Sequence, residues 1–476
     1  MDAKELLINL GYKEEESKKI VENNFLYDSN DRTLAKNIFN NYNYLIQLGY
    51  KKEEIIKMTT RVPSLYCLSK SAIEEKINNL IKHGYTENEI INMTKKYPQI
   101  YTFSKERLDL RIEFLTKLGY DKKDIISMTK KLPQTYGLSI ENINKKIKDM
   151  INLGYKKDEV INIIKRNPKI LSHSIKNIEG TIECLEKIGF KKKDVIFLTK
   201  KIPQIFDYSE TTIENKIEEL INIGYKKEDS VKMIKKLPQI ILLSSELLNE
   251  KIEEFIKMGY TREQIIKMTQ NFSNIYSYSI ETINKKMNDF IKLGYTKNEI
   301  IKMTYYLPQL YSRTIESLNQ KIEDMIRLGY TKEEALKMSK SLPSIYAYSI
   351  ETIYKKIELL ISLGYNKKQV LEITKNYPSI YANSIETITE KIEFYNDIGL
   401  HDIPLIGPNH LMQSVNLSYA RYMFYKEIGV DITIDNYRRL FTSNKKFEKT
   451  YDITRDELIE MYNYEEYKEK KDERTI

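Results

Sequence analysis

The chain has 476 residues, of which 41% are hydrophobic and 30% are charged, so it can bury a sizeable core and is too apolar to be a disordered chain. Its 77 Lys and Arg residues exceed its 68 Asp and Glu residues by nine, a mild excess that does not by itself identify a polyanionic partner. There is no run of about 18 apolar residues, so we expect no membrane span, and Cys67 and Cys184 lack the spacing of a disulfide or zinc framework. We expect a cytoplasmic protein, because the first residues carry acidic groups, unlike a signal or transit peptide.

The N-terminal segment, residues 1–48, is predicted to be a capping or divergent repeat. It contains Gly11 in an LGY motif, and the same motif recurs 38 residues later at Gly49. The ends of a repeat array need atypical units, because a terminal unit has a neighbour on one side only. We therefore expect helices here that close the array.

Residues 49–399 are predicted to form ten helical repeats of 35 residues. In most repeats the first residue is a Gly between an apolar residue and an aromatic one. A fixed period of this length is typical of stacked helical units that cannot bury their apolar faces alone. The repeats begin at Gly49, Gly84, Gly119, Gly154, Gly189, Gly224, Gly259, Gly294, Gly329 and Gly364, and Gly399 closes the series.

Each repeat is predicted to hold two long helices joined by a short helical turn. The first, helix A, begins with a capping box such as Thr296 with Glu299. A proline 14 residues after the Gly ends helix A and starts the turn. Six residues later a Ser or Thr, such as Ser279, caps the second helix, helix B, which ends at the next Gly. The prolines are Pro63, Pro98, Pro133, Pro168, Pro203, Pro238, Pro308, Pro343 and Pro378, and Ser273 replaces proline in the remaining repeat.

Residues 400–476 are predicted to form a C-terminal helical cap or a small helical domain. The 35-residue pattern stops near His401, with Pro404 and Pro408 at the break, but helical patterning continues beyond it. The whole chain is therefore expected to be an all-α, superhelical α-solenoid with helical caps.

A basic residue recurs on helix B, 27 residues after each repeat Gly. This position lies on the flank of the apolar stripe, so the stem can rest on the core while the charge enters a groove. We expect one continuous row that binds the phosphates of nucleic acid, and ordinary solvated lysines are the alternative. This helix-B row is Lys76, Arg111, Lys146, Lys216, Lys251, Lys286, Lys321, Lys356 and Lys391, with Thr181 as the one exception.

A second basic position lies at the end of helix A, where a cation also suits the helix dipole. It holds a cation in the first six repeats and then changes to Asn271, Tyr306, Ser341 and Asn376. We include it among the candidate nucleic-acid-binding residues, with the solvated face as an equal alternative. This helix-A set is Arg61, Lys96, Lys131, Arg166, Lys201 and Lys236.

Other recurrent positions are explained by packing or by loop tolerance. The aromatic residue 17 positions after the Gly could stack on bases, but Leu171 and Ile241 replace it in two repeats, which favours a core role. The Met row of helix A is also assigned to the core. The two residues that directly precede each helix-B cap vary strongly between repeats, as in proteins in which each repeat recognises one base. Many of these pairs are apolar and poor at bonding base edges, so we favour a plain connecting turn.

The repeat from Leu328 to Gly364 resembles the repeat of the mitochondrial transcription termination factor (mTERF) family. The shared features are LG before an acidic helix start, a central proline followed by apolar residues, and a Ser-capped second helix with a basic residue. The resemblance covers roughly residues 10 to 400. It implies a left-handed superhelix of three-helix units with a basic groove, in proteins that bind duplex DNA or RNA in organelles and affect transcription or ribosome assembly. The chain differs in its very regular period, and we do not expect its first residues to act as a transit peptide.

The chain carries no recognisable catalytic or cofactor motif. It lacks P-loop, GxGxxG and GxSxG sequences, and its four histidines have no metal-ligand spacing, so we expect no enzyme, cofactor, metal ion or small-molecule substrate. We expect a monomer that binds nucleic acid, with or without sequence preference, and that regulates transcription. Duplex DNA is favoured over RNA as its ligand. The alternatives are a protein- or peptide-binding scaffold, RNA binding in ribosome assembly, and an enzyme with its site in residues 400–476.

Overall fold

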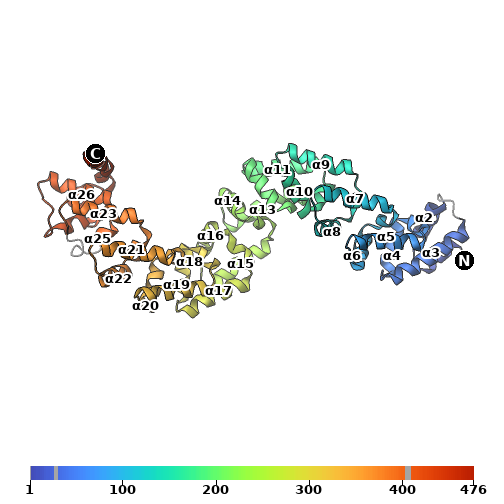
Figure 1. Ribbon diagram of the computed structural model, residues 1–476, viewed down its shortest axis with the longest axis horizontal. Coiled ribbons are helices and arrows are strands. Elements are labelled where there is room, and N and C mark those ends of the chain that lie inside the picture. The colour runs from blue at the N-terminus through green and yellow to red at the C-terminus, as the bar shows by residue number, and fades with distance from the viewer. Residues whose placement is uncertain (1, 26–29, 402–408, 476) are drawn as a thin grey trace. The chain divides into compact units, whose positions relative to one another are not determined.

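The computed structural model describes residues 2–25, 30–401 and 409–475, and all regular structure in these ranges is helical. It contains two compact units, unit 1 (Met1–Leu243) and unit 2 (Ser244–Ile476), and within each unit the helices follow one another in chain order (Figure 1). No helix in the described ranges is both long enough and apolar enough to cross a membrane. The fold is an all-α solenoid, as predicted.

Every repeat has the predicted three-part form of helix A, a 3-10 turn and helix B. Helix A is α4 (Lys52–Arg61), α6 (Glu87–Lys96), α8 (Lys122–Lys131), α10 (Lys157–Arg166), α12 (Lys192–Lys201), α14 (Lys227–Lys236), α16 (Arg262–Asn271), α18 (Lys297–Tyr306), α20 (Lys332–Ser341) and α22 (Lys367–Asn376). The 3-10 turns are η1 (Pro63–Cys67), η2 (Pro98–Thr102), η3 (Pro133–Tyr136), η4 (Pro168–Ser172), η5 (Pro203–Asp207), η6 (Pro238–Leu242), η7 (Ser273–Ser277), η8 (Pro308–Ser312), η9 (Pro343–Ala347) and η10 (Pro378–Ala382). Helix B is α5 (Lys70–Lys82), α7 (Lys105–Lys117), α9 (Ile140–Asn152), α11 (Ile175–Ile188), α13 (Glu210–Ile223), α15 (Ser245–Lys257), α17 (Ile280–Leu293), α19 (Ile315–Leu328), α21 (Ile350–Ser362) and α23 (Ile385–Asp397).

The predicted capping residues fix these boundaries. The Thr296 hydroxyl accepts the Glu299 N–H, and the Glu299 carboxylate accepts the Thr296 N–H at 2.9 Å, which completes the capping box of α18. The Ser279 hydroxyl accepts the Thr282 N–H at 3.2 Å and caps α17. Ser273, at the position without proline, instead bonds back to the Thr269 carbonyl at 3.1 Å and still begins η7.

The repeat Gly is needed where helix B turns into the next repeat. Gly329 has φ +117°, a conformation that residues with a Cβ rarely adopt. A Cβ there would also lie 2.9 Å from Leu371 Cδ1 of α22. Gly329 therefore ends α19 and leaves room for α22, which is helix A of the repeat after the one that Gly329 begins.

A buried hydroxyl network links consecutive repeats inside each unit. In five repeats, the Tyr after the repeat Gly bonds a Thr or Ser in helix A of the next repeat and the Tyr of that repeat's 3-10 turn, as Tyr85 does with Thr129 at 2.6 Å and Tyr136 at 2.8 Å. The aromatic residues of the turns are buried, which confirms the packing interpretation and leaves no face open for bases. The helix-A methionines are also buried, as expected: Met58, Met93, Met128, Met233, Met268, Met303 and Met338.

The two ends extend the same architecture with altered units. The N-terminal segment holds α1 (Ala3–Asn9), α2 (Glu14–Phe25) and α3 (Asp31–Gln47), and Tyr12 makes the repeat-type bonds to Thr59 and Tyr66. Pro404 and Pro408 lie outside the described residues. The C-terminal elements are α25 (Asn409–Met412), α26 (Val415–Glu427), η11 (Tyr437–Phe441), α27 (Asn444–Tyr451), α28 (Arg455–Met461) and α29 (Tyr464–Thr475), which surround an aromatic core.

Candidate functional site

The helix-B row lies between repeats, with its charged groups bonded to backbone carbonyls. For eight of the nine cations, the side chain donates a hydrogen bond to a carbonyl just before the cap of the next helix B. The donor and acceptor pairs are Arg111 with Leu138, Lys146 with His173, Lys216 with Leu243, Lys251 with Tyr276 and Tyr278, Lys286 with Arg313, Lys321 with Tyr348, Lys356 with Tyr381, and Lys391 with Leu411. Lys76 lies 3.7 Å from Glu75.

This placement corrects the expectation that the row sends its charges into an open groove. Arg111, Lys146, Lys251, Lys356 and Lys391 are buried, and Lys251 is only 4% exposed. Burial lowers the pKa of each of these five side chains below its ordinary value. The stems pack as predicted, but the ammonium and guanidinium groups hold neighbouring repeats together. Direct contact of this row with nucleic acid stays a prediction.

The row has a further member that the sequence analysis missed. Arg421 follows the α26 cap, Ser414, by the same seven residues that separate Lys391 from Ser384. It is 1% exposed and donates to the Leu440 carbonyl at 2.8 Å. The seven-residue distance from the capping Ser predicts Arg421. The 27-residue distance from the repeat Gly does not predict it, because the pattern is shortened after Gly399.

The helix-A set is exposed and lies entirely in unit 1. Arg61 donates to the Lys96 carbonyl at 2.9 Å, so the guanidinium reaches the C-terminal end of the next helix A. Lys131 Nζ reaches the Arg166 carbonyl at 3.4 Å, and Arg166 donates in turn to the Lys201 carbonyl at 3.2 Å. The partial negative charge at helix C-termini attracts these cations and aligns them from repeat to repeat.

A basic hollow opens beside this set, between the helices A of two successive repeats. It has a volume of about 650 Å³ and is lined by Lys96, Lys123, Lys130 and Lys131, with Glu89 as its one carboxylate. Glu89 is already paired with Lys130 at 2.6 Å. Three ammonium groups therefore remain to attract an anion at this point of unit 1.

A third lysine row, which the sequence analysis did not identify, forms ion pairs between successive helices A. Each lysine binds the acidic residue in the first turn of helix A in the preceding repeat. The pairs are Lys95–Glu54, Lys130–Glu89, Lys165–Asp124, Lys200–Glu159, Lys235–Asp194, Lys340–Glu299 and Lys375–Glu334. The sequence contains a signal for this row, because the lysine follows its acidic partner by 41 residues in every pair. Where Gln264 replaces the acidic residue, Tyr305 replaces the lysine 41 residues later.

We expect the Lys130→Met variant to be less stable than wild type at pH 7. This difference in stability should become smaller as the pH falls. The hydrogen bond from Lys130 and the Thr86 N–H hold the pKa of Glu89 below its ordinary value. A carboxyl group with a lowered folded-state pKa stabilises the fold above the unfolded-state pKa, and this contribution is lost as the pH falls through the folded-state pKa. Urea midpoints of wild type and variant should therefore differ at pH 7 and converge as the pH falls through the lowered folded-state pKa of Glu89. Lys123→Met, which breaks no ion pair with Glu89, is the control; equal pH profiles for the two variants would contradict the expectation.

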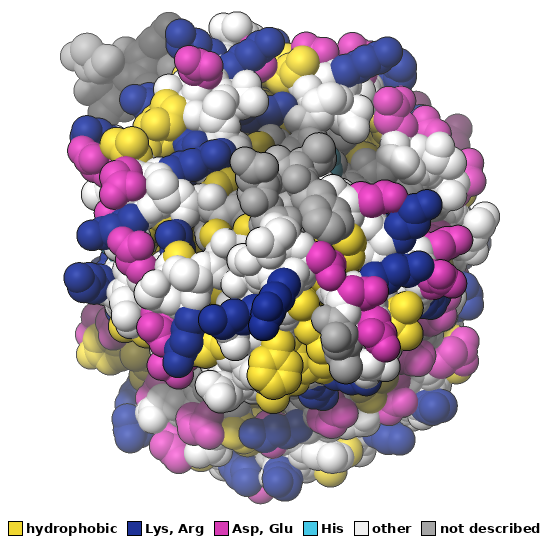
Figure 2. All heavy atoms as spheres, turned by 90° about the vertical axis from the view of Figure 1, so that its right-hand side faces the viewer, with side chains coloured by type: hydrophobic (Ala, Val, Ile, Leu, Met, Phe, Trp, Pro, Cys, Tyr) yellow, Lys and Arg dark blue, Asp and Glu magenta, His cyan; other side chains and the backbone are white. Residues whose placement is uncertain are grey.

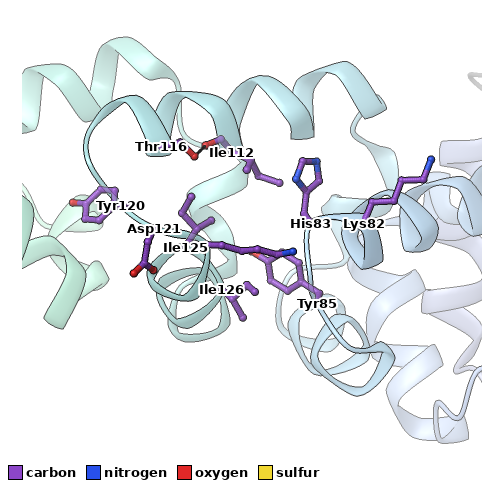
Figure 3. Close-up of a pocket in the computed structure, with 10 residues that line it drawn as sticks. Lys82, His83, Tyr85, Ile112, Thr116, Tyr120, Asp121, Ile125 and Ile126 are labelled. Carbon is purple, nitrogen blue, oxygen red and sulfur yellow. Dashed lines mark hydrogen bonds between the residues drawn. The ribbon is translucent and has the colours of Figure 1, made fainter.

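A smaller hollow of about 250 Å³ lies where α5 meets α7 and α8. Figure 3 shows Ile112, Ile125 and Tyr85 around it, while the Lys82 ammonium and the Asp121 carboxylate point away from each other. His83 also lines the hollow, and its ring is bonded at 2.7 Å to Asp109, which is not a lining residue. Within the described ranges, His, Cys, Asp and Glu residues nowhere gather in a group of three that could hold a metal ion.

Comparison with known proteins identifies the repeat. The mTERF family model matches residues 3–152, 147–293 and 288–401, three consecutive stretches that span most of the chain. The chain belongs to the mTERF family. This family generally binds nucleic acids and is not known for enzymes, so nucleic-acid binding is the supported broad activity. No curated protein matches the chain.

The mTERF-family chain carries charges of both signs on its surface. On the face seen in Figure 2, Lys and Arg side chains are interspersed with Asp and Glu side chains. In unit 2 the position of the helix-A set holds Asn271, Tyr306, Ser341 and Asn376. The ordered cations of unit 1 are therefore a local feature and do not follow from a uniformly basic surface.

Proposed function

We propose that this mTERF-family chain binds double-stranded nucleic acid, duplex DNA first, through the helix-A set of unit 1. The observation that carries the proposal is the presence of exposed cations at the same helix end in six consecutive repeats. Bonds to the next helix end hold several of them in line, as for Arg61 and Arg166. Such an array suits the evenly spaced charges of a phosphate backbone, where each neutralised phosphate releases counterions.

The helix-B row has a positioning part in this proposal. Its N–H donors are engaged by carbonyls such as those of Leu138 and Tyr348, so fewer donors remain for phosphate. By joining α7, α9 and α13 to the following repeat, the row supports a constant spacing of the helix-A set. Contacts between cations and phosphates carry no sequence information, so sequence-tolerant binding is the favoured mode. Transcription regulation, the monomeric state and the cytoplasmic location stay predictions.

The proposal is tested by titrating fluorescent duplex DNA, duplex RNA and single strands with the full chain at several salt concentrations. The test variant changes Arg61, Lys96, Lys131 and Arg166 to Gln. Affinity for the duplex should fall about tenfold or more, and the slope of log K against log salt should become shallower by about 3 to 4, since each lost phosphate contact removes about 0.9. Duplex DNA should bind more tightly than either single strand.

A control variant with the same change in net charge separates the array from general electrostatics. It changes four exposed helix-B lysines of unit 1 to Gln: Lys70, Lys82, Lys117 and Lys187. We expect this variant to keep most of the affinity and most of the salt slope. Equal losses in the two variants would show that net charge alone matters, and the absence of salt-dependent binding by wild type would overturn the proposal.

A protein-binding role is the second candidate, and one surface feature of unit 2 favours it. The residue three positions before the repeat Gly is an exposed isoleucine in four consecutive repeats of unit 2, whereas in unit 1 this series is interrupted by Thr116 and Glu186. The unit 2 residues are Ile256, Ile291, Ile326 and Ile361, and those of unit 1 are Ile46, Ile81, Ile151 and Ile221. Aligned apolar side chains of this kind are found at protein interaction surfaces. If wild type binds no nucleic acid, a pull-down with wild type and a variant with these four residues changed to Ser is the next experiment.

A further inference from the structure

One junction between repeats lacks the cation that the others hold. In the repeat that begins at Gly154, the helix-B row is interrupted by Thr181, which is 2% exposed. The Thr181 hydroxyl bonds back to the Asn177 carbonyl of its own helix at 3.1 Å. The backbone carbonyl of Tyr208, 27 residues after Thr181, is the counterpart of the Leu138 and Leu243 carbonyls that cations bind at neighbouring junctions. It receives no cation from α11.

A hollow of about 960 Å³ opens at this junction. Gly180 and Thr181 of α11 line one side, and Tyr208 and Glu210 at the start of α13 line the other. A Cβ on Gly180 would lie 2.4 Å from Glu210 Oε1, so the carboxylate rests against the glycine. Since one water molecule takes about 30 Å³ of liquid, the hollow admits a much larger group.

The lining of the hollow favours a positively charged guest. It contains the carboxylates of Glu179, Glu183, Asp207 and Glu210 against one lysine, Lys176, and one histidine. That histidine, His173, is bonded to Asp207 at 2.8 Å, and the four carboxylates outnumber the basic side chains, so the lining carries an excess of negative charge. An anion would be repelled here, whereas a cation with several N–H donors can bond both the Tyr208 carbonyl and a carboxylate.

The neighbouring junctions indicate which cation fits. Lys146 and Lys216, on the helices B before and after α11, each bring an ammonium group on a four-carbon stem to the equivalent carbonyl. The Thr181 junction keeps the acceptor but has lost both the stem and the ammonium. We propose that the hollow between α11 and α13 binds a primary alkylammonium group, from a free diamine or polyamine or from an exposed lysine of a partner protein. The ammonium donates to the Tyr208 carbonyl and the Glu210 carboxylate, and its alkyl chain lies along Thr181.

The test is isothermal titration calorimetry of the full chain at constant ionic strength. The probes are 1,5-diaminopentane for the free amine and Nα-acetyl-lysine N-methylamide for the side chain of a partner. Pentan-1-ol and tetramethylammonium chloride are the matched neutral and hindered controls. We expect saturable binding of one amine per chain and no saturation with either control. Binding of both amines, or of the diamine alone, supports a free amine as ligand, and binding of the capped lysine alone supports a partner protein.

Two variants at position 181 fill the hollow in different ways. Thr181→Lys supplies the missing ammonium, so amine affinity should fall at least tenfold while the urea midpoint rises. Thr181→Met fills the same space without charge and should also weaken binding without raising the midpoint. Glu210→Gln leaves the hollow open and should weaken amine binding. The proposal is overturned if wild type does not saturate with either amine, if Mg²⁺ or Ca²⁺ alone saturates the site, or if Thr181→Lys binds as well as wild type. None of these measurements involves nucleic acid.

Discussion

The Lys251→Ala variant is expected to lose about 3 kcal/mol of unfolding free energy. Lys251 is 4% exposed, and its Nζ donates to the Tyr276 carbonyl at 2.9 Å and to the Tyr278 carbonyl. A hydrogen bond with a charged partner contributes about 1.5 to 3 kcal/mol, and a truncated side chain also leaves its packed stem empty. The loss is measured as a shift of the urea midpoint at constant m-value, with unfolding of the full chain monitored by far-ultraviolet circular dichroism.

Two further variants separate the charge from the packing. Lys251→Met keeps the stem and removes the donor, so it should recover about half of the loss. Lys257 lies on the same helix, α15, with its side chain 74% exposed, and Lys257→Ala should change stability by no more than about 0.5 kcal/mol. If Lys251→Ala is no worse than Lys257→Ala, the bond between the ammonium and the carbonyls does not stabilise the junction.

The sequence predicts the helix-B row but not the direction of its charges. A constant sign at one position of the repeat is visible in the period, and the flank of the apolar stripe follows from helical geometry. The acceptor is invisible, because it is a backbone carbonyl that any residue supplies. The residues that supply it include Leu138, His173 and Arg313, so the residue type varies along the array. The variability of the turn thus has a physical explanation: its backbone makes the contact between repeats, and its side chains are less constrained.

The helix boundaries could be predicted closely because local chemistry determines them. Capping hydroxyls, a central proline and a Gly with positive φ lie within one turn of the boundary that each of them fixes. The Lys–acid pairs between helices A and the shortened C-terminal unit depend on contacts between repeats. The pairs appear in the sequence through coupled changes, such as Gln264 with Tyr305, of which a single chain offers few, and the C-terminal unit appears through the seven residues between Ser414 and Arg421.

We expect the Tyr330→Phe variant to lose about 2 kcal/mol of unfolding free energy. The Tyr330 hydroxyl is buried and bonds both Thr374 and, at 2.7 Å, Tyr381. Burial raises the pKa of Tyr330 above its ordinary value, so the network is neutral at pH 7. Loss of one hydroxyl leaves two buried partners with fewer bonds, at a cost of about 1 to 3 kcal/mol. The urea midpoint measures the loss, and Tyr306→Phe, at a side chain that is 75% exposed, is the control.

At one junction of the chain, apolar residues replace all three hydroxyl-bearing residues of this network. Phe190 follows the repeat Gly in place of Tyr, and the two positions that would bond its hydroxyl hold the buried Ile234 and Ile241. Removing all three hydroxyls together should therefore cost less than the sum of the single losses, since no buried donor or acceptor is left without a partner. The variant Tyr330→Phe/Thr374→Val/Tyr381→Phe should lie within about 1 kcal/mol of wild type. Additive losses in this triple variant would mean that each hydroxyl contributes independently, and the apolar junction at Phe190 would then need a different explanation.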